Sequence, residues 1–390
     1  MRNTLLILLL STGLVAHSQV GVIDYLNGVE KNNKQLQATK QLMDARKISC
    51  KTGLTPENPF IEYGYMPGSN GSNGEKQVYG VSQAFNFPTV YFAQNRLASG
   101  QSEKVELEYL QYRQDILLDA KILFYEYVYL NKLSKEFKIR AANAERLYNS
   151  YQVKYKQGNA SILEKNKAKI QNLQMQQDLK LLEQKVASYY NQLKQMNGGI
   201  EIELADTAYF EVELISIDSI KTEMMELLPE FQILESETVV QKMNLNLQKQ
   251  SWIPEFVMGY EAEVEPDGTY GGVKAGISIP LWQDKNAVRL AKAELLYAEV
   301  HAEEVKTTIF SQTEILHQEI MKHKQMLNEY RESMGELMQM SLLDKALQLG
   351  QISVIEYFNE LSFYYDITDH YLECEREYYL LLAKLYKYKF

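Results

Sequence analysis

The side chains able to do chemistry are few, and they form no catalytic arrangement. Five histidines and two cysteines give no His-Glu-x-x-His motif, no Cys-His pair and no Ser-His-Asp set. No glycine-rich phosphate loop follows a strand-like segment. Met334, Met338 and Met340 near His323 are soft ligands that could hold copper, but such methionines more often pack between helices. We therefore expect no enzyme activity, no metal site and no cofactor.

A turn pattern that occurs twice is more informative. Gly-x-x-Ser-x-x-Glu occupies residues 158–164 and again residues 350–356. In each copy the glycine can take the positive φ that ends a helix, the serine can cap the next helix, and the glutamate completes a capping box. Other features recur at nearly the same separation of 192 to 195 positions: Arg-Leu-Ala at 96–98 and 289–291, and Pro59 and Pro254. The chain is predicted to be a duplication.

Long helices must carry these two turns. No glycine or proline interrupts residues 101–157, and apolar residues recur there at helical spacing. At about 1.5 Å per residue, this helix would approach 80 Å. A return helix is predicted to run from Ser161 to Met196. Further helices are predicted at about 20–51, 219–247, 284–349 and from Ser353 to the C-terminus, the last with core tyrosines at seven-residue spacing, Tyr357, Tyr364, Tyr371 and Tyr378.

Two strand hairpins interrupt the helical pattern, at about 58–87 and 252–281. In both, apolar residues alternate with polar or small ones on either side of a polar turn. Each arm of the second hairpin has about ten residues, the length of a tilted strand that crosses a bilayer, although a half-buried hairpin of a soluble protein carries the same pattern. The apolar face of the second hairpin is formed by Phe256, Met258, Tyr260, Ala262, Val264, Val273, Ala275, Ile277, Ile279 and Leu281.

The first residues predict export from the cytoplasm. Arg2 precedes an apolar run at 5–15, and Ala16-His17-Ser18 is a small-x-small cleavage signal, so residues 1–18 are predicted to be a signal peptide. No later window has about twenty uninterrupted apolar residues. If the protein enters a membrane, it must do so as strands.

Charge and cysteine content bear on which binding partners and covalent crosslinks the sequence allows. The chain has 41 Lys and Arg against 51 Asp and Glu, a formal net charge of −10, and no basic cluster that would indicate nucleic-acid binding. Its two cysteines, Cys50 and Cys374, form no disulfide framework, and the sequence leaves open whether they pair.

Each half supplies two strands, so one chain offers four. Four strands cannot close a barrel, and their unpaired edges cannot face lipid. If the hairpins enter a membrane, an oligomer must share the sheet.

A set of short motifs recurs in a fixed order along the chain: Asn58-Pro59-Phe60, Val81 to Pro88, Trp252 to Phe256, Gly276 to Leu281 and the two Gly-x-x-Ser turns. Through these motifs the chain resembles the TolC-type outer membrane efflux proteins over nearly all of residues 19–390. The stretch at 82–88 is similar to the heavy-metal branch of that family, whose members are CzcC-like and CusC-like. The resemblance implies a mainly α-helical fold with a membrane β-barrel, built from a duplicated helix–strand–strand–helix unit with long antiparallel coiled-coil helices.

The same resemblance implies the assembly and its partners. A homotrimer would share one barrel in outer membrane lipid and one helical tunnel in the periplasm. It would be the passive exit duct for a periplasmic adaptor and an inner-membrane pump of the resistance-nodulation-division type, with heavy-metal cations as a candidate cargo. Residues 19–390 would form one duplicated chain with barrel strands at 58–87 and 252–281, helical tunnel segments at 20–51, 89–196, 220–250 and 284–388, and a belt segment at 197–219.

The resemblance also suggests which residues act. In the family, acidic residues just beyond the second turn narrow the periplasmic entrance. The matching positions are Glu356 and Asn359, with Glu360 beside them, so one of the two acidic positions is kept. Three copies of Glu356 could filter cations, or Glu356 could only cap its helix as Glu164 does. The surfaces that meet the adaptor or pump would lie at the two turns, with Lys154, Gly158, Ser161, Ala346, Gly350 and Ser353.

A soluble periplasmic coiled-coil protein, either structural or a pump adaptor, is the alternative. An adaptor would have one helical hairpin and many short strands punctuated by glycine, whereas this sequence predicts two hairpins of helices and four strands.

Overall fold

The computed structural model describes residues 21–68, 74–202, 204, 208–282, 285–337 and 340–390. The predicted signal peptide at 1–18, Met338 and the side chain of Met340 lie outside that part. The chain divides into two compact units. One comprises Met1–Asn33, Asp119–Val212 and His323–Leu380, and the other comprises Lys34–Leu118, Glu213–Lys322 and Leu381–Phe390.

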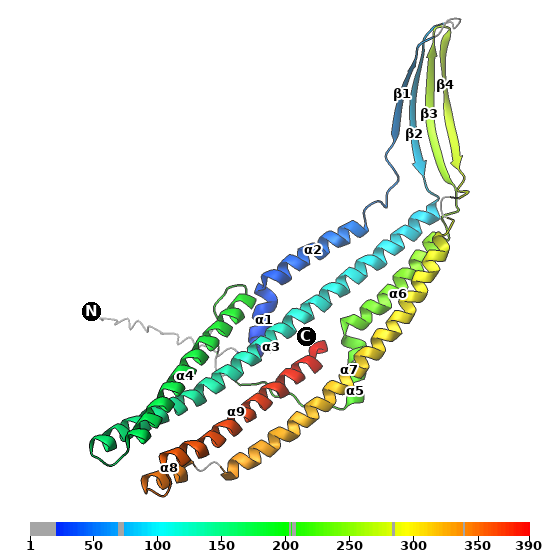
Figure 1. The fold of residues 1–390 in the computed structure, drawn as a ribbon. Coiled ribbons are helices and arrows are strands. Elements are labelled where there is room, and N and C mark those ends of the chain that lie inside the picture. Colours follow the sequence, from blue (N-terminus) through cyan, green and yellow to red (C-terminus); the bar gives the residue numbers. More distant parts are fainter. Residues whose placement is uncertain (1–20, 69–73, 203, 205–207, 283–284, 338–339) are drawn as a thin grey trace, which may run out of the picture. The chain divides into compact units, whose positions relative to one another are not determined.

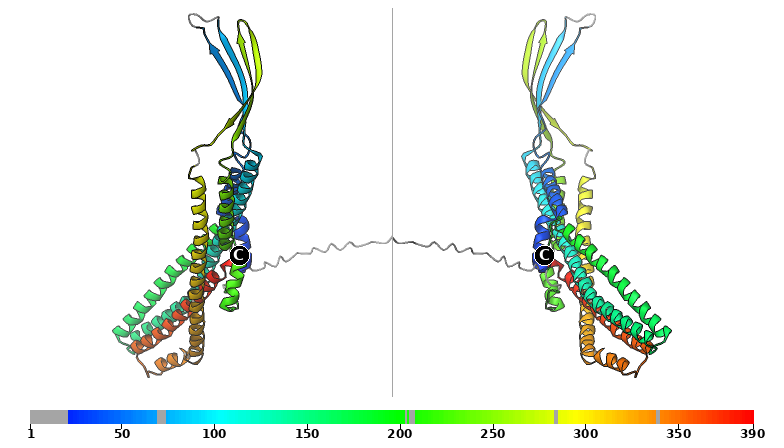
Figure 2. Two further views of the ribbon diagram at one scale, coloured as in Figure 1. Left: turned by 90° about the vertical axis from the view of Figure 1, so that its right-hand side faces the viewer. Right: turned by 90° about the vertical axis from the view of Figure 1, so that its left-hand side faces the viewer.

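The second unit contains a four-stranded antiparallel sheet (Figure 2). Its strands are β1 (Phe60–Met66), β2 (Lys76–Phe85), β3 (Glu255–Glu265) and β4 (Gly268–Ser278), and they lie in the order β1-β2-β3-β4. Each predicted hairpin therefore forms, and the pairing of β2 with β3 joins the two halves of the duplication. Strands β1 and β4 are the edges of the sheet.

The first unit is built from two helical hairpins (Figure 1). The first is the C-terminal part of α3 (Pro88–Lys156) with the returning α4 (Ile162–Met196), and the second is α8 (Met340–Gln348) with α9 (Val354–Leu385). Helix α3 has 69 residues, so at 1.5 Å per residue it is about 100 Å long. The unit also holds α1 (Val22–Asn32) and the end of α7 (Ala287–Leu337).

The apolar stripe predicted along α3 packs against neighbouring helices, and its part after Leu118 contributes to the core of this unit. Leu130 packs with Leu182 of α4 and Leu372 of α9, so α3 contacts both neighbouring helices. Seven apolar residues recur at regular spacing along the predicted helix at 101–157: Leu110, Leu117, Phe124, Leu130, Phe137, Ala144 and Tyr151. Of these seven, only Leu110 is exposed, Phe137 is half-buried and the other five are buried. The tyrosines of α9 behave similarly, because Tyr357 is buried and Tyr371 packs against the same cluster as Leu372.

Charged residues add a second set of contacts between α3 and α9. Arg140 is 3% exposed, and its guanidinium donates to both carboxylate oxygens of Asp369 at 2.8 and 2.6 Å. The rings of Phe137 and Tyr365 flank the same guanidinium at 4.8 and 4.4 Å. Lys132 donates to Glu375 at 2.6 Å, and only 9% of the Glu375 side chain is exposed. These buried pairs fix the register of α9 against α3.

The helices of the second unit pack beside the N-terminal part of α3. They are α2 (Lys34–Cys50), α5 (Ile217–Leu227), α6 (Pro229–Gln248) and the first part of α7, followed by the short 3₁₀ helix η1 (Lys387–Lys389). A Cβ on Gly100 of α3 would lie 3.0 Å from the sulfur of Met243, so the glycine lets α6 approach closely. Tyr386 donates a hydrogen bond to the carbonyl oxygen of Glu213 at 2.9 Å and thereby holds the end of the predicted belt segment.

Two predicted helices are interrupted, at equivalent places in the duplication. The helix predicted at 20–51 is two helices separated at Asn33, and the one predicted at 219–247 is two helices separated at Leu228, which lies 195 positions later. Both residues have extended backbone angles. Pro229 explains the second interruption because it lacks the N–H that a continuous helix needs.

The first interruption has a tertiary cause. Asn33 is 4% exposed, and its side-chain amide donates to the carbonyl oxygen of Met196 at the end of α4. Asn32 donates to the side chain of Asn197 at 3.0 Å. These contacts join α1 to the Asn-Gly-Gly turn that ends α4, which the local sequence around Asn33 does not reveal.

The helix predicted at 284–349 is also described as two helices. They are α7, which ends at Leu337, and α8, which begins at Met340, and the residues between them lie outside the described part.

Candidate docking tips and pore-facing surfaces

The first predicted turn, between α3 and α4, has the geometry that its residues suggest. Gly158 has φ +78°, a conformation that side chains other than glycine rarely adopt. The N–H of Asn159 donates to the carbonyl oxygen of Lys154 at 2.8 Å, which closes the last turn of α3. Ser161 then caps α4: its hydroxyl accepts from the N–H of Glu164, and the Glu164 carboxylate accepts from the N–H of Ser161. The predicted capping box is confirmed.

The second turn, between α8 and α9, repeats this geometry. Gly350 has φ +71°, and the N–H of Gln351 donates to the carbonyl oxygen of Ala346 at 2.9 Å. The N–H of Ser353 donates to the Glu356 carboxylate at 2.7 Å, while the Ser353 hydroxyl accepts from the N–H of Glu356. The structure thus shows Glu356 capping its helix, as Glu164 does. A Cβ on Gly158 or Gly350 would meet no described atom within 4 Å.

The capping contacts shift both carboxyl groups in the same direction. The hydrogen bond from the Ser353 N–H holds the pKa of Glu356 below its ordinary value of 4.5, and the Ser161 N–H does the same for Glu164. Both carboxylates are therefore charged at neutral pH.

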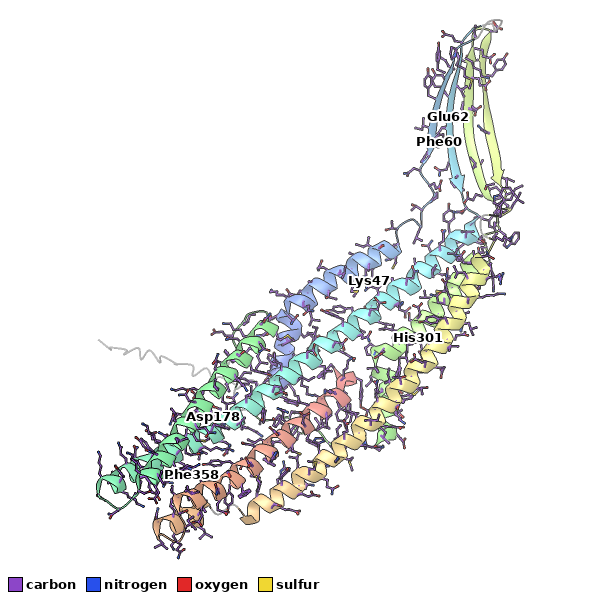
Figure 3. The ribbon with its side chains drawn as sticks, in the orientation of Figure 1. Lys47, Phe60, Glu62, Asp178, His301 and Phe358 are labelled. Carbon is purple, nitrogen blue, oxygen red and sulfur yellow. The ribbon has the colours of Figure 1, made fainter. Side chains whose placement is uncertain are left out.

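The two turns lie together because their flanking helices share one apolar cluster. Tyr151 of α3 and Ala168 of α4 pack against residues of α8 and α9, including Phe358, which is labelled in Figure 3. The cluster comprises Tyr151, Ala168, Leu347, Val354, Tyr357, Phe358 and Leu361. Six of the nine predicted site residues, Lys154, Gly158, Ser161, Ala346, Gly350 and Ser353, are thus gathered at one end of the first unit.

A groove separates α3 from α8 beside this cluster. Its volume is about 190 Å³, and Leu147, Tyr151, Leu347 and Tyr357 give it an apolar floor. Across the groove, Arg146 donates to Asp344 at 3.0 Å, and the hydroxyl of Tyr357 donates to the other oxygen of Asp344 at 2.7 Å. Sequence reasoning did not find this groove, because its walls come from residues about 200 positions apart.

The three residues predicted at the constriction occupy an exposed part of α9. Glu356, Asn359 and Glu360 are all exposed in the single chain. Phe363 follows one turn after Glu360 and is 62% exposed, which is unusual for a side chain of this size on a helix that otherwise packs well. Phe363 lies seven residues after Glu356 and therefore on the same face of α9. This spacing could have identified Phe363 from the sequence as part of that face, but it was not among the predicted site residues.

The sheet has two chemically different faces. Cross-strand partners lie on the same face, so the register places Ile61, Val81, Tyr260 and Val273 together. These apolar side chains are 80%, 46%, 52% and 79% exposed. An exposed apolar face of this extent on all four strands is not expected in water.

The opposite face carries the charged residues of the sheet. Glu62, labelled in Figure 3, shares it with six further charged residues of β2, β3 and β4 and with several glycines. Lys76 pairs with Glu263 at 2.6 Å, and Lys274 pairs with Glu261 at 2.7 Å.

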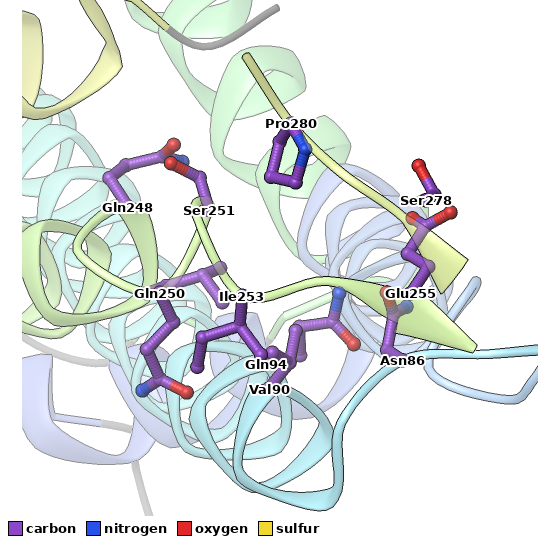
Figure 4. Close-up of a pocket in the computed structure, with 11 residues that line it drawn as sticks. Asn86, Val90, Gln94, Gln248, Gln250, Ser251, Ile253, Glu255, Ser278 and Pro280 are labelled. Carbon is purple, nitrogen blue, oxygen red and sulfur yellow. The ribbon is translucent and has the colours of Figure 1, made fainter.

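A second cavity lies where the sheet meets the helices (Figure 4). Its volume is about 290 Å³, and its lining includes Asn86, Gln94, Gln250, Glu255 and Ser278. The buried side-chain oxygens of Gln94 and Gln250 have no hydrogen-bond partner in the described part of the chain. Such a polar cavity is large enough for ordered water.

Large aromatic side chains surround the base of the sheet. Phe85, Phe92, Trp252 and Trp282 are 37%, 71%, 71% and 78% exposed, and Phe85 lies on the apolar face. Toward the other end, Tyr65 and Tyr79 are exposed on the same face. Aromatic residues at both ends of an apolar band are typical of strands that meet the two interfaces of a membrane.

Several other kinds of site are not found. Within the described ranges, no three His, Cys, Asp or Glu side chains are grouped so that they could hold a metal ion. Cys50 and Cys374 are both free thiols. No described helix is both long enough and apolar enough to span a membrane.

No protein-family model matches the sequence, and no curated protein matches it. Several solved structures match its fold. CusC is 12% identical, with a TM-score of 0.79 and coverage of 95% of this chain and 92% of CusC. The CmeC outer membrane channel of Campylobacter jejuni is 12% identical, with a TM-score of 0.78 and coverage of 94% and 85%.

The open state of the MtrE outer membrane channel of Neisseria gonorrhoeae is 11% identical, with a TM-score of 0.68 and coverage of 94% and 88%. The described chain, mainly helical with four antiparallel strands in a duplicated helix–strand–strand–helix order, therefore has the fold of these outer membrane channels.

Proposed function

We propose that this protein is the outer membrane exit duct of a tripartite efflux system. It conducts substrates passively from an inner-membrane pump and a periplasmic adaptor to the cell exterior, and it performs no enzymatic step. The observation that carries the proposal is the four-stranded sheet, with an exposed apolar face, a charged opposite face and two unpaired edges.

The sheet requires partners of its own kind. Backbone N–H and C=O groups at the edges β1 and β4 cannot be left unsatisfied in lipid. Joining β1 of one chain to β4 of the next satisfies them, and three chains supply twelve strands. The apolar face with Ile61 and Val273 then meets lipid, while the face with Glu62 and Lys274 meets a water-filled lumen. The long helices continue this lumen into the periplasm.

The length of the strands supports a membrane location. Strands β3 and β4 have 11 residues each, about 36 Å at 3.3 Å per residue. A tilt of about 45° reduces this length to about 25 Å along the membrane normal, the height of the apolar band in outer membrane barrels. The aromatic residues at both ends of the sheet match the two interfaces.

The tips are the surfaces for the adaptor and pump. Gly158 and Gly350 leave open space at the ends of the two hairpins, so that the helical hairpin of a partner can approach the backbone closely. The exposed Glu356, Asn359 and Glu360, with Phe363 one turn further, line the entrance. Three copies of this acidic surface would attract cations.

Heavy-metal cations are the proposed cargo. The resemblance of residues 82–88 to the heavy-metal branch supports this choice, and CusC is among the structures with the same fold. The charged lumen face of the sheet has five glutamates against two lysines, an excess that favours cations: Glu62, Glu255, Glu261, Glu263 and Glu265 against Lys76 and Lys274.

A deletion strain of the native host tests this function. We expect increased sensitivity to Zn²⁺, Co²⁺, Cd²⁺ or Cu⁺, restored by the wild-type gene, and recovery of the protein in the outer membrane after a carbonate wash. Sensitivity to organic toxicants alone would support the exit-duct function and contradict the proposal that heavy-metal cations are the cargo. Recovery in the soluble periplasmic fraction would favour a coiled-coil periplasmic protein and overturn the proposal.

A further inference from the structure

The two tips share their backbone geometry but differ in charge. Residues 150–170 contain five lysines and a single acidic residue, Glu164. None of these lysines lies within ion-pair distance of a carboxylate among the described residues. The Nζ of Lys154 instead lies 5.1 Å from the ring centroid of Tyr151. The Nζ of Lys165 lies 4.3 Å from the ring centroid of Tyr155. The five are Lys154, Lys156, Lys165, Lys167 and Lys169.

The second tip is acidic. Residues 341–361 contain one lysine and three acidic residues. Leu342, Leu349 and Ile355 are 58%, 64% and 54% exposed there. A duplication that keeps the turn but reverses the charge indicates that the two tips meet different chemistry.

The groove between α3 and α8 connects these two surfaces. Lys154 lies at its rim, and its apolar floor belongs to the cluster that packs the tips together. A volume of about 190 Å³ accommodates one or two side chains of a partner. The rim of the groove therefore presents the ammonium group of Lys154, and its floor presents an apolar surface for a partner side chain.

We propose that the first tip and this groove bind an acidic helical hairpin of a separate periplasmic protein. Carboxylates of that hairpin pair with Lys154 and Lys156, and one of its apolar side chains enters the groove. The proposal rests on the proposed function, because it specifies the chemistry of the adaptor that the duct receives.

A second copy of this chain is the competing occupant, and its own contacts argue against it. Of the three carboxylates at the second tip, Asp344 is bound by Arg146 and Tyr357, and Glu356 caps α9. Of these three, only Glu360 makes neither a hydrogen bond nor an ion pair in the described part of the chain, so a neighbouring copy offers one available carboxylate to five lysines. A partner that brings several carboxylates balances this charge better.

Charge reversal in the native host tests the proposal. Lys154→Glu combined with Lys156→Glu should lower export at least tenfold and reduce co-purification of the adaptor, with normal trimer content on native gels. The matched control is Lys180→Glu with Lys185→Glu, two exposed α4 lysines outside the tip, which changes the net charge equally and should leave export unchanged.

The contact itself is identified with a photo-crosslinking amino acid at position 156 in the full-length protein. The adduct should map to a helical hairpin with carboxylates, and replacing those carboxylates by lysine should restore export to the Lys154→Glu, Lys156→Glu variant. A crosslink only to a second copy of this chain, normal export by the charge-reversed variant, or failure of the charge exchange to restore export would each overturn the proposal.

The two proposals fail in distinguishable ways. If the gene deletion leaves export unchanged or the protein is recovered in the soluble fraction, the duct function fails. If wild-type protein supports export and the charge-reversed variant does so equally well, only the acidic partner fails.

Discussion

The buried ion pair between Arg140 and Asp369 should contribute strongly to the packing of α9 on α3. Asp369→Asn keeps the shape of the side chain but removes the charge that balances a guanidinium of 3% exposure. Breaking a fully buried pair costs about 3–5 kcal/mol. Because 32% of the Asp369 side chain is exposed, water offsets part of that loss, and we expect about 2–3 kcal/mol.

Hydrogen–deuterium exchange in the native assembly measures this change locally. A loss of about 2–3 kcal/mol in the free energy of local opening corresponds to exchange about 30 to 150 times faster. The effect should be concentrated in α9 near Tyr365 and Asp369.

The matched control is Glu183→Gln. Glu183 pairs with Lys138 at 3.7 Å, but the two side chains are 50% and 60% exposed. An exposed pair contributes at most about 1 kcal/mol, so exchange should rise no more than about fivefold. Equal exchange rates in the two variants would refute the assignment of α9 packing to the buried pair.

Three further predictions concern the tips. Gly158→Trp or Gly350→Trp should abolish export while trimers persist. The control is Gly53→Trp, which imposes the same positive φ strain in open space at the end of α2 and should leave export intact. Loss of export in all three variants would contradict a docking role for the tips. Glu356→Gln should reduce cation preference in single-channel recordings and weaken block by multivalent cations, whereas Glu164→Gln should change both much less; equal recordings would leave Glu356 as a helix cap only. Because the folded-state pKa of each glutamate lies below the ordinary 4.5, its support of the helix start is present above about pH 4.5 and is lost as the pH falls through that lower pKa. The protection of the tip amides, measured as the exchange rate relative to an unfolded peptide at the same pH, should therefore fall in acid for the wild-type protein, and this fall should be absent at the tip that carries the Gln substitution.

Local patterns in the sequence predicted most of the elements, since their causes are local. The alternation in 252–281 predicted β3 and β4, and the register places Phe256 and Ile277 on one face, as expected. The Gly-x-x-Ser-x-x-Glu spacing predicted both capping boxes because all their hydrogen bonds lie within a few residues.

Features that depend on distant residues were not predictable from one sequence. The interruption at Asn33 depends on contacts with the end of α4, more than 160 positions away. The bidentate contact of Arg140 with Asp369 joins residues 229 positions apart. Pro229, by contrast, is a local signal for the interruption, and the prediction of one continuous helix at 219–247 did not take it into account.

The candidate site was predicted unevenly for the same reason. The sequence indicated the two glycine turns and the exposed glutamates of α9, but it could not show that Tyr151 and Leu347 pack together and place both turns at one end. The groove and the charge difference between the tips became meaningful only after this packing was known. The roles of Glu356, Asn359 and Glu360 in a constriction remain predictions.

Disulfide crosslinking between the sheet edges tests the shared barrel most directly. In a variant with Cys50→Ser and Cys374→Ser, Tyr63→Cys on β1 is combined in turn with Gly271→Cys, Val273→Cys and Ala275→Cys on β4, all on the apolar face. Within one chain these edges are three strand spacings apart, about 14 Å, which is too far for a disulfide. We predict that oxidised outer membranes contain covalent dimers and trimers, and nothing larger, for at least one pair. Monomers alone for every pair, or a ladder that continues beyond three chains, would contradict the account.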